Sequence, residues 1–323
     1  MSPELPAALQ GAIARELEGV PRAGLAARAA LASQAYRAGR GSAGVIRGAE
    51  DALAYALARL PATYAACAAV FAEARRRAPG FAPANLLDAG AGTAAASWAA
   101  AQAWPELAAV TWLDSNPSFL SFAGRLAAEA PAPLAQATRL RADLTGAGDW
   151  PSAELVAASY ALAEIDPASQ PQVLARLWAA TRGLLALVEP GTPAGFARLR
   201  AAREALIAAG AEILAPCPHA EVCPMTGSDW CHFSVRLPRS RDHRRAKGAE
   251  VPFEDERFAY LLAARPGLGA PAPARILAPP RSGKPGIDLK LCTPAGLEPR
   301  FVPRRDKPAH AQARRLGWGD AVE

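Results

Sequence analysis

Four cysteines in the last third of the chain have the arrangement expected of ligands around one metal or iron–sulfur centre. The 323 residues include only five cysteines, and the fifth, Cys67, lies in an apolar helical pattern that predicts a core position. Thiolates bind both zinc and iron–sulfur clusters. In an intracellular protein, grouped cysteines more often bind metal than form disulfides. The four candidate ligands are Cys217, Cys223, Cys231 and Cys292.

The spacing C-x5-C-x7-C-x60-C leaves two kinds of centre open. Zinc ribbons usually supply their cysteines in tight C-x2–4-C pairs, which this segment lacks. Irregular spacing suits a 4Fe–4S cluster, whose corners are further apart than the ligands of a tetrahedral zinc ion. His219 and His232 adjoin the cysteines and could serve as ligands in a zinc site. We therefore expect a metal centre, with iron–sulfur and zinc as alternatives.

A turn containing two glycines forms a second candidate site. The segment 85–92, NLLDAGAG, reads as a short buried strand that enters the turn, and a helix is expected to follow. Glycines allow the backbone to approach a ligand closely, and a helix N-terminus favours polar or anionic groups. Asp114 ends the next predicted strand, where a carboxylate can accept both hydroxyls of a ribose. We predict a nucleoside cofactor site that includes Asp88, Gly90, Gly92, Thr93, Asp114 and Ser115.

Two more predicted strands end in polar residues that complete this site. Asp143 is expected at the adenine edge of the cofactor, and Ser159 beside its methyl group. Asp-x-Gly-x-Gly, followed by an acid after the second strand, resembles the S-adenosylmethionine motif of Rossmann-like methyltransferases. A dinucleotide fingerprint would require a third glycine where the chain has Ala95. The run 158–165, ASYALAEI, lacks the Asn/Asp-Pro-Pro-aromatic motif of many amino-methylating enzymes, so the sequence supports cofactor binding better than methyl transfer.

Three regions are predicted to position these residues. Residues 1–80 show helical periodicity and are expected to form a helical N-terminal domain, with Pro61 interrupting or beginning a helix. Strands and helices alternate over 81–213, which predicts a Rossmann-like α/β methyltransferase core with a parallel sheet. Residues 214–323 are predicted to form a basic, β-rich, cluster-binding region that completes the core. Its last strands are expected to bring Cys292 back to the other cysteines.

The charge is concentrated near the C-terminus. Residues 236–315 contain 18 Lys/Arg against 8 Asp/Glu, which favours a polyanionic partner, RNA first, over a merely solvated basic face. The sequence shows no apolar run approaching the roughly 18 residues of a membrane span, and no signal or transit pattern. We therefore expect a cytoplasmic protein and leave its oligomeric state open. The expected phosphate contacts are Arg236, Arg239, Arg241, Arg244, Arg245 and Lys247.

Several segments together resemble a known family. CPH, CP and WCHFSVRLPRS around the first three cysteines, LKLC at the fourth and the ARRLGWGD tail resemble the methyltransferase-like assembly factors of the mitochondrial small ribosomal subunit and their bacterial relatives. The resemblance runs from the glycine turn to the C-terminus. It implies a Rossmann-like methyltransferase domain and association with small-subunit ribosomal RNA in a ribosome precursor. It also implies a 4Fe–4S cluster on Cys217, Cys223, Cys231 and Cys292.

Three functional interpretations follow. The first is an assembly or translation factor that binds S-adenosylmethionine, a structural cluster and ribosomal RNA. The second is an active RNA methyltransferase, in which Tyr160 or Glu164 would stack on or hydrogen-bond the acceptor base. The third makes the cluster a redox or iron sensor. A radical S-adenosylmethionine enzyme is disfavoured, because the C-x3-C-x2-C pattern of that class is missing from the sequence.

Overall fold

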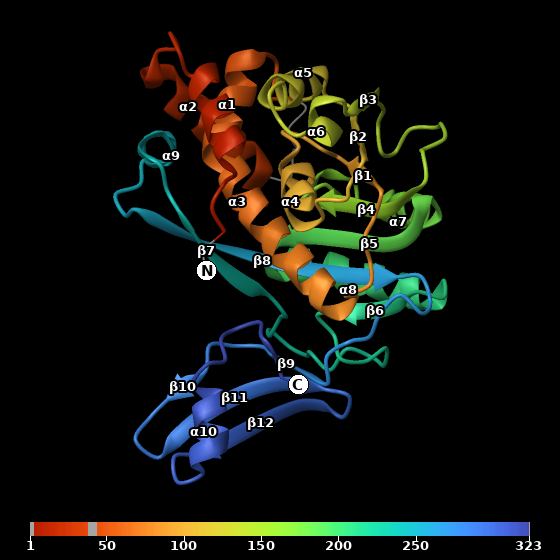
Figure 1. Ribbon diagram of the computed structural model, residues 1–323, viewed down its shortest axis with the longest axis vertical. Coiled ribbons are helices and arrows are strands. Elements are labelled where there is room, and N and C mark those ends of the chain that lie inside the picture. The colour runs from red at the N-terminus through yellow and green to blue at the C-terminus, as the bar shows by residue number, and fades with distance from the viewer. Residues whose placement is uncertain (1–2, 38–43, 323) are drawn as a thin grey trace.

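The computed structural model describes residues 3–37 and 44–322, which form a large mixed sheet flanked by helices and a smaller C-terminal sheet (Figure 1). Three helices begin the chain, and the longest of them, α3, lies against the large sheet. The three helices are α1 (Ala7–Glu16), α2 (Arg22–Arg37) and α3 (Ala49–Arg77).

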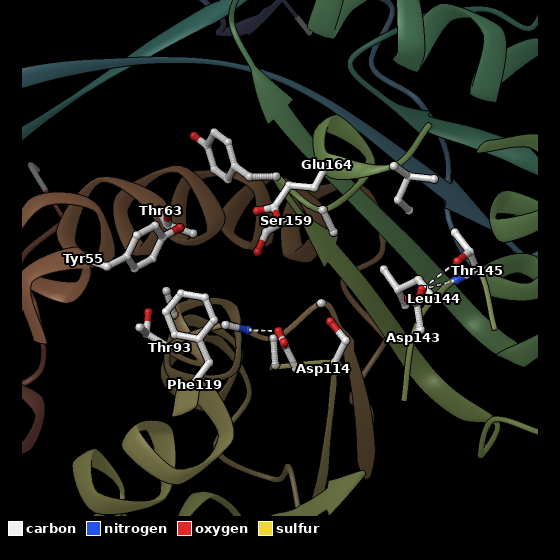
Figure 2. Close-up of a pocket in the computed structure, with 18 of the residues that line it drawn as sticks. Tyr55, Thr63, Thr93, Asp114, Phe119, Asp143, Leu144, Thr145, Ser159 and Glu164 are labelled. Atoms are coloured by element: carbon white, nitrogen blue, oxygen red, sulfur yellow. Dashed lines mark hydrogen bonds between the residues drawn. The ribbon is translucent and has the colours of Figure 1, made fainter. Parts of the chain in front are cut away.

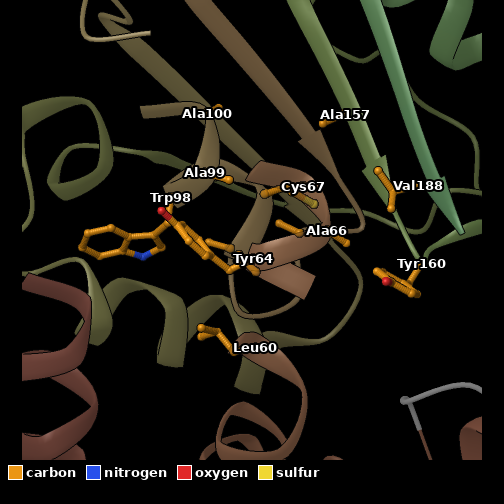
Figure 3. Close-up of a cluster of buried hydrophobic side chains, with 14 of the residues drawn as sticks. Leu60, Tyr64, Ala66, Cys67, Trp98, Ala99, Ala100, Ala157, Tyr160 and Val188 are labelled. Atoms are coloured by element: carbon orange, nitrogen blue, oxygen red, sulfur yellow. The ribbon is translucent and has the colours of Figure 1, made fainter. Parts of the chain in front are cut away.

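Helix α3 runs without interruption through Pro61, so the prediction that this proline interrupts or begins a helix was wrong. Packing explains the difference: Leu60, Tyr64 and Cys67 on α3 belong to one core with α4 and the sheet (Figure 3). Burial of this long apolar face outweighs the backbone hydrogen bond lost at the proline. The core position predicted for Cys67 is confirmed, since its side chain is fully buried.

The same helix corrects a second expectation. By length and composition alone, α3 is apolar enough to cross a membrane, whereas the sequence had suggested that no segment approaches this limit. Most of its apolar stretch is buried inside the protein, as in the core helix of a folded domain. Its hydrophobicity is therefore accounted for by contacts within the chain.

The large sheet has the strand order β3-β2-β1-β4-β5-β8-β6, and β7 pairs with β8. The first five strands are parallel, and β8 is antiparallel to its neighbours β5, β6 and β7. Across the sheet, the strand numbers fall from β3 to β1 and then rise from β4 to β5, so the strand order reverses between β1 and β4. Ligands bind at this point in doubly wound sheets. The strands are β1 (Asn85–Ala89), β2 (Ala109–Asp114), β3 (Thr138–Arg141), β4 (Ala153–Ser159), β5 (Thr181–Pro190), β6 (Glu212–Ala215), β7 (Phe233–Pro238) and β8 (Phe253–Ala264).

Helices cover both faces of this sheet. Leu86 packs into a core with the N-terminal helices, whereas its neighbour Leu87 packs into a second core that includes Val173 of α7 and Leu199 of α8. Consecutive residues of a strand point to opposite faces, so both faces are buried. The remaining helices of this region are α4 (Ala95–Ala103), α5 (Pro117–Leu126), α6 (Ala132–Ala135), the short 3-10 helix η1 (Leu162–Glu164), α7 (Gln170–Ala180) and α8 (Pro193–Ala208).

The C-terminal part forms its own small sheet, ordered β10-β11-β9-β13, with β12 paired to β11. Its core includes Ile276, Leu289 and Leu291. The predicted fold class is confirmed: a Rossmann-like methyltransferase fold with an N-terminal helical segment and a β-rich C-terminal extension that carries a cysteine. Its elements are α9 (Arg241–Lys247) between β7 and β8, β9 (Ala274–Ile276), β10 (Arg281–Ser282), β11 (Gly286–Thr293), β12 (Gly296–Pro303), α10 (Lys307–Ala313) and β13 (Ala321–Val322).

A buried ion pair joins the small sheet to α3. Arg275 Nη2 of β9 lies 2.6 Å from Glu73 Oε1, and the two side chains are only 1% and 3% exposed. Arg275 also donates hydrogen bonds to the carbonyl oxygens of Pro216 (3.1 Å) and Gly319 (3.0 Å). Because these charges are out of water, removing one partner costs far more than breaking a surface pair.

We predict that Arg275→Met lowers the free energy of unfolding by about 3 kcal/mol. Glu73 would keep Arg76 and Arg77 but lose its most buried partner, and the carbonyl oxygens of Pro216 and Gly319 would lose a donor. Urea denaturation of the full chain would measure the change. Arg300→Gln is the matched control, since it removes an exposed pair with Glu298 in the same small sheet and should cost less than about 1 kcal/mol. Equal losses in the two variants would contradict this role of Arg275.

Candidate functional site

A cavity of about 380 Å³ lies at the carboxyl ends of the parallel strands β1 to β4 (Figure 2). It is located where the strand order reverses, which is the usual ligand position in such sheets. Of the eight residues predicted to bind a cofactor, all but Asp88 line this cavity. The seven are Gly90, Gly92, Thr93, Asp114, Ser115, Asp143 and Ser159.

The turn after β1 depends on its glycines. Gly90 and Gly92 have φ angles of +74° and +53°, in the left-handed region that L side chains rarely adopt. A Cβ atom on Gly90 would lie 2.7 Å from the Cβ of Ala161, so a larger residue would clash with the chain after β4. The turn is therefore held tightly between the ends of two neighbouring strands.

Asp114 faces this turn and is already oriented by backbone groups. Its Oδ2 accepts a hydrogen bond from the Gly92 amide at 2.8 Å, and its Oδ1 accepts one from the Asn116 amide at 2.8 Å. Burial raises the pKa of Asp114, whereas these two hydrogen bonds lower it. Each carboxylate oxygen keeps a further lone pair, so the group can still accept hydroxyl hydrogen bonds from a ligand in the cavity.

Asp88 lies beneath the turn, out of reach of the cavity. Its Oδ2 accepts hydrogen bonds from the Ser97 amide (3.1 Å) and hydroxyl (2.6 Å), and Ser97 Oγ accepts one from Trp112 Nε1. Burial raises the pKa of Asp88 to about 6. In this structure, Asp88 fastens the start of α4 to the sheet, which is a supporting role for the cavity.

The opposite wall comes from residues that the sequence did not single out. Tyr55 and Thr63 project from α3 and Phe119 from α5, across the cavity from Asp143 (Figure 2). The Tyr55 and Phe119 ring centroids are 5.0 Å apart. Aromatic faces of this kind can pack against a flat heterocycle. Only the packing of α3 on the sheet reveals this wall, because helical periodicity alone assigns such aromatics to the core.

The two residues suggested as acceptor contacts both line the cavity but differ in their other contacts. The Tyr160 hydroxyl donates a 2.9 Å hydrogen bond to Glu256 Oε1 of β8, and Arg59 Nη2 lies 3.2 Å from the same oxygen. Tyr160 is only 8% exposed and has a φ of +59°, which is unusual for a residue with a side chain. Glu164 lines the cavity next to Ser159 (Figure 2). Tyr160 is thus engaged in joining α3, β4 and β8.

The four predicted metal ligands converge on a second, smaller cavity. Cys217 follows β6, Cys223 and Cys231 lie in the loop before β7, and Cys292 comes from β11. Burial raises the pKa of Cys231 well above its usual value, and the neighbouring thiols add to this effect. Burial, then the Cys217 and Cys223 thiols, raise the pKa of Cys292 to about 12. Because all four line one small cavity, the cysteines lie close together although they are far apart in sequence.

The two histidines near the cysteines take different positions. His219 lines the small cavity, and its Nε2 lies 3.6 Å from Cys292 Sγ. His232 is stacked on Trp230 at 4.9 Å and contacts Trp318 edge-on. Across residues 3–37 and 44–322, no group of three or more His, Cys, Asp or Glu side chains has an arrangement that could hold a metal ion. This finding supports neither the iron–sulfur cluster nor the zinc alternative, and both stay predictions.

Half of the six expected phosphate contacts are already paired with carboxylates. Arg236 Nε lies 2.7 Å from Asp255 Oδ1, and both Arg239 and Lys247 form ion pairs with Glu254. Within the described part of the chain, the other three, all on α9, have no carboxylate partner. Two of them, Arg241 and Arg245, are exposed, whereas Arg244 is partly buried. Among these six residues, those without a carboxylate partner in the described part of the chain thus all lie on α9.

The strand order and the cavity define the class of the protein, a Rossmann-like fold of S-adenosylmethionine-dependent methyltransferases. Residues 49–323 match the family model described as "Mitochondrial small ribosomal subunit Rsm22", and the chain belongs to this family. The predicted family is thereby confirmed, whereas the iron–sulfur cluster that the resemblance implied stays a prediction. The family model covers both cavities, since the cofactor and cysteine residues all fall within the matched range.

Two curated relatives are similar to this chain. It is 30% identical over 298 residues to the human "Ribosome assembly protein METTL17, mitochondrial". The aligned part covers 84% of this chain and 62% of that protein. It is 26% identical over 288 residues to "Rsm22-cox11 tandem protein 2, mitochondrial" of Schizosaccharomyces pombe, covering 73% and 38%. The chain thus spans less than two thirds of either relative.

Solved methyltransferase structures are also similar to this chain. Magnesium protoporphyrin IX methyltransferase from Synechocystis PCC 6803 with bound SAH is 18% identical, with a TM-score of 0.42 over 63% of this chain and 83% of that one. Precorrin-6y C5,15-methyltransferase from Geobacter metallireducens is 16% identical, with a TM-score of 0.40 over 61% and 86%.

Proposed function

We propose that this chain is an assembly factor of the small ribosomal subunit that binds S-adenosylmethionine, a 4Fe–4S cluster and ribosomal RNA. The observation that carries the proposal is the family match over residues 49–323, which includes both cavities. The human relative is named a ribosome assembly protein. Each binding activity has its own support in the structure and its own test.

The larger cavity suits the nucleoside part of S-adenosylmethionine. Gly90 and Gly92 allow close approach of the backbone, and the Asp114 carboxylate is held in place to accept ribose hydroxyl groups. Tyr55 and Phe119 offer aromatic surface for the adenine. When bound, the cofactor would supply an activated methyl group. The residues of this chain would bind and orient it.

We predict that Asp114→Asn weakens the binding of S-adenosylmethionine by about tenfold or more, because a charged hydrogen-bond acceptor of the ribose is lost. Isothermal titration calorimetry would measure the dissociation constant, with thermal unfolding to check that the turn remains folded. Asp149→Asn, in an exposed loop that does not line the cavity, is the control and should bind normally. Unchanged affinity in Asp114→Asn would argue against this ribose site.

The four cysteines match the number of ligands that a 4Fe–4S cluster requires. One thiolate is available for each of the four irons. The cluster would connect the loop between β6 and β7 to β11 of the small sheet. Its binding free energy would then contribute to folding of the C-terminal part.

We expect protein purified without oxygen to contain about four irons and four acid-labile sulfides per chain. Cys223→Ser should lose most of both, because one iron would lack its thiolate. Cys67→Ala is the control, since this fifth cysteine is buried in the α3 core and should retain a full complement. One zinc and no sulfide in the wild-type protein would contradict the cluster.

The basic helix α9 is the proposed contact to RNA phosphates. For small-subunit ribosomal RNA, affinity should fall as the salt concentration rises. We predict that the double variant Arg241→Gln, Arg245→Gln makes the slope of log affinity against log salt less steep by about two. Arg236→Gln is the matched control: its charge is paired with Asp255, so the slope should stay near the wild-type value. Equal effects of both variants, or binding independent of salt, would exclude α9 as the contact.

Methyl transfer to ribosomal RNA is the second candidate function, favoured by one observation. Glu164 lines the cavity beside Ser159, at the end of β4, where a methyl acceptor would enter. Incorporation of labelled methyl groups into precursor ribosomal RNA, lost in Gly90→Arg, would support it. Labelling that survives this substitution would come from a contaminating enzyme, because an arginine cannot fit against Ala161.

A further inference from the structure

A positively charged side chain is buried at the cysteine cavity without a counter-charge. Arg203 of α8 is 3% exposed and lines the cavity together with the four cysteines. Its Nη2 donates hydrogen bonds to the carbonyl oxygens of His219 (2.7 Å) and Glu221 (2.8 Å). Its Nε is buried and has no hydrogen-bond partner. In the described part of the chain, no carboxylate lies within ion-pair distance of this guanidinium.

A second buried arginine near the same cavity shows what is missing. Arg275 lies opposite Cys292 in the pairing of β9 and β11, and its charge is compensated by Glu73 at 2.6 Å. A buried charge without a partner is costly, and proteins rarely keep one unless it meets an anion. The two arginines therefore differ: Arg275 is neutralised by the protein itself, whereas Arg203 leaves a positive charge and an N–H donor at the cysteines.

The cysteines are the groups that could supply the missing anion. Cys217 and the other three cysteines line the same small cavity as the Arg203 guanidinium, so their sulfur atoms are the nearby groups that can become anionic. Four neutral thiols would leave the arginine uncompensated. Four thiolates around a 4Fe–4S core carry a net negative charge, which a neighbouring guanidinium stabilises.

We propose that Arg203 is the counter-charge of the cysteine site and donates its free Nε–H group to sulfur when the cluster is bound. This inference rests on the proposed cluster. Local charge and hydrogen bonds to sulfur are main determinants of a cluster's reduction potential, so Arg203 holds that potential higher and favours retention of the cluster. Its hydrogen bonds to the carbonyl oxygens of His219 and Glu221 also fix the loop that carries these residues.

The test compares four full-length proteins purified without oxygen: wild type, Arg203→Gln, Arg203→Lys and Arg300→Gln. Iron and sulfide per chain and the midpoint potential of the cluster are measured, with thermal unfolding as a check of the fold. Arg203→Gln should shift the one-electron equilibrium about tenfold toward the oxidised cluster. This corresponds to a fall of about 59 mV in the midpoint potential. Arg203→Lys should stay near wild type. So should Arg300→Gln, because Arg300 is exposed, is paired with Glu298 and does not line the cysteine cavity.

Each other outcome has a defined meaning. A wild-type protein without iron and sulfide would contradict both the cluster and this inference. A normal cluster with the same potential in all four proteins would overturn the inference and leave the cluster standing. If Arg203→Gln loses the cluster, the Arg203→Lys variant distinguishes the two explanations. Retention of the cluster in the lysine variant supports the role of Arg203 as counter-charge. Loss in both variants would mean that Arg203 only holds the loop carbonyls, which overturns its role as counter-charge.

Discussion

The buried ion pair between Glu73 and Arg275 is the contact on which the cysteine site depends. Arg275 pairs across β9 and β11 with Cys292, and its guanidinium binds the carbonyl oxygen of Pro216, next to Cys217. It thereby joins α3, the loop after β6 and the small sheet at one point. The fourth cysteine reaches the other three because this charge pair fixes where the small sheet lies against the body of the protein.

Helix α3 connects the two cavities. Tyr55 and Thr63, toward its N-terminal end, form a wall of the larger cavity, and Glu73 near its C-terminal end holds Arg275 beside the cysteines. Arg59, which lies between Tyr55 and Thr63 along the helix, meets Glu256 of β8. One helix therefore contributes to the cofactor cavity, to the junction of β4 with β8 and to the support of the metal-ligand candidates. This sharing explains why so apolar a helix belongs to the protein core.

Local patterns in the sequence were sufficient for features carried by short segments. The glycine turn, Asp114 and the alternation of strands and helices are all encoded within a few residues. The features that sequence reasoning missed arise from contacts between distant segments, such as Arg59 with Glu256 or Arg203 with the cysteine loop. Asp88 illustrates the limit: its position in the motif suggested a ligand contact, but only the packing of Ser97 shows that its carboxylate points into the core.

The central claim is that this chain acts on the small ribosomal subunit during its assembly. The most direct test is sedimentation of cell extracts prepared without oxygen, with the protein quantified across the gradient and crosslinked to RNA in each fraction. The account predicts that it sediments with incomplete small-subunit particles, is crosslinked there to small-subunit ribosomal RNA and is depleted from mature ribosomes. A protein that remains at the top of the gradient, without crosslinks to that RNA, would contradict it.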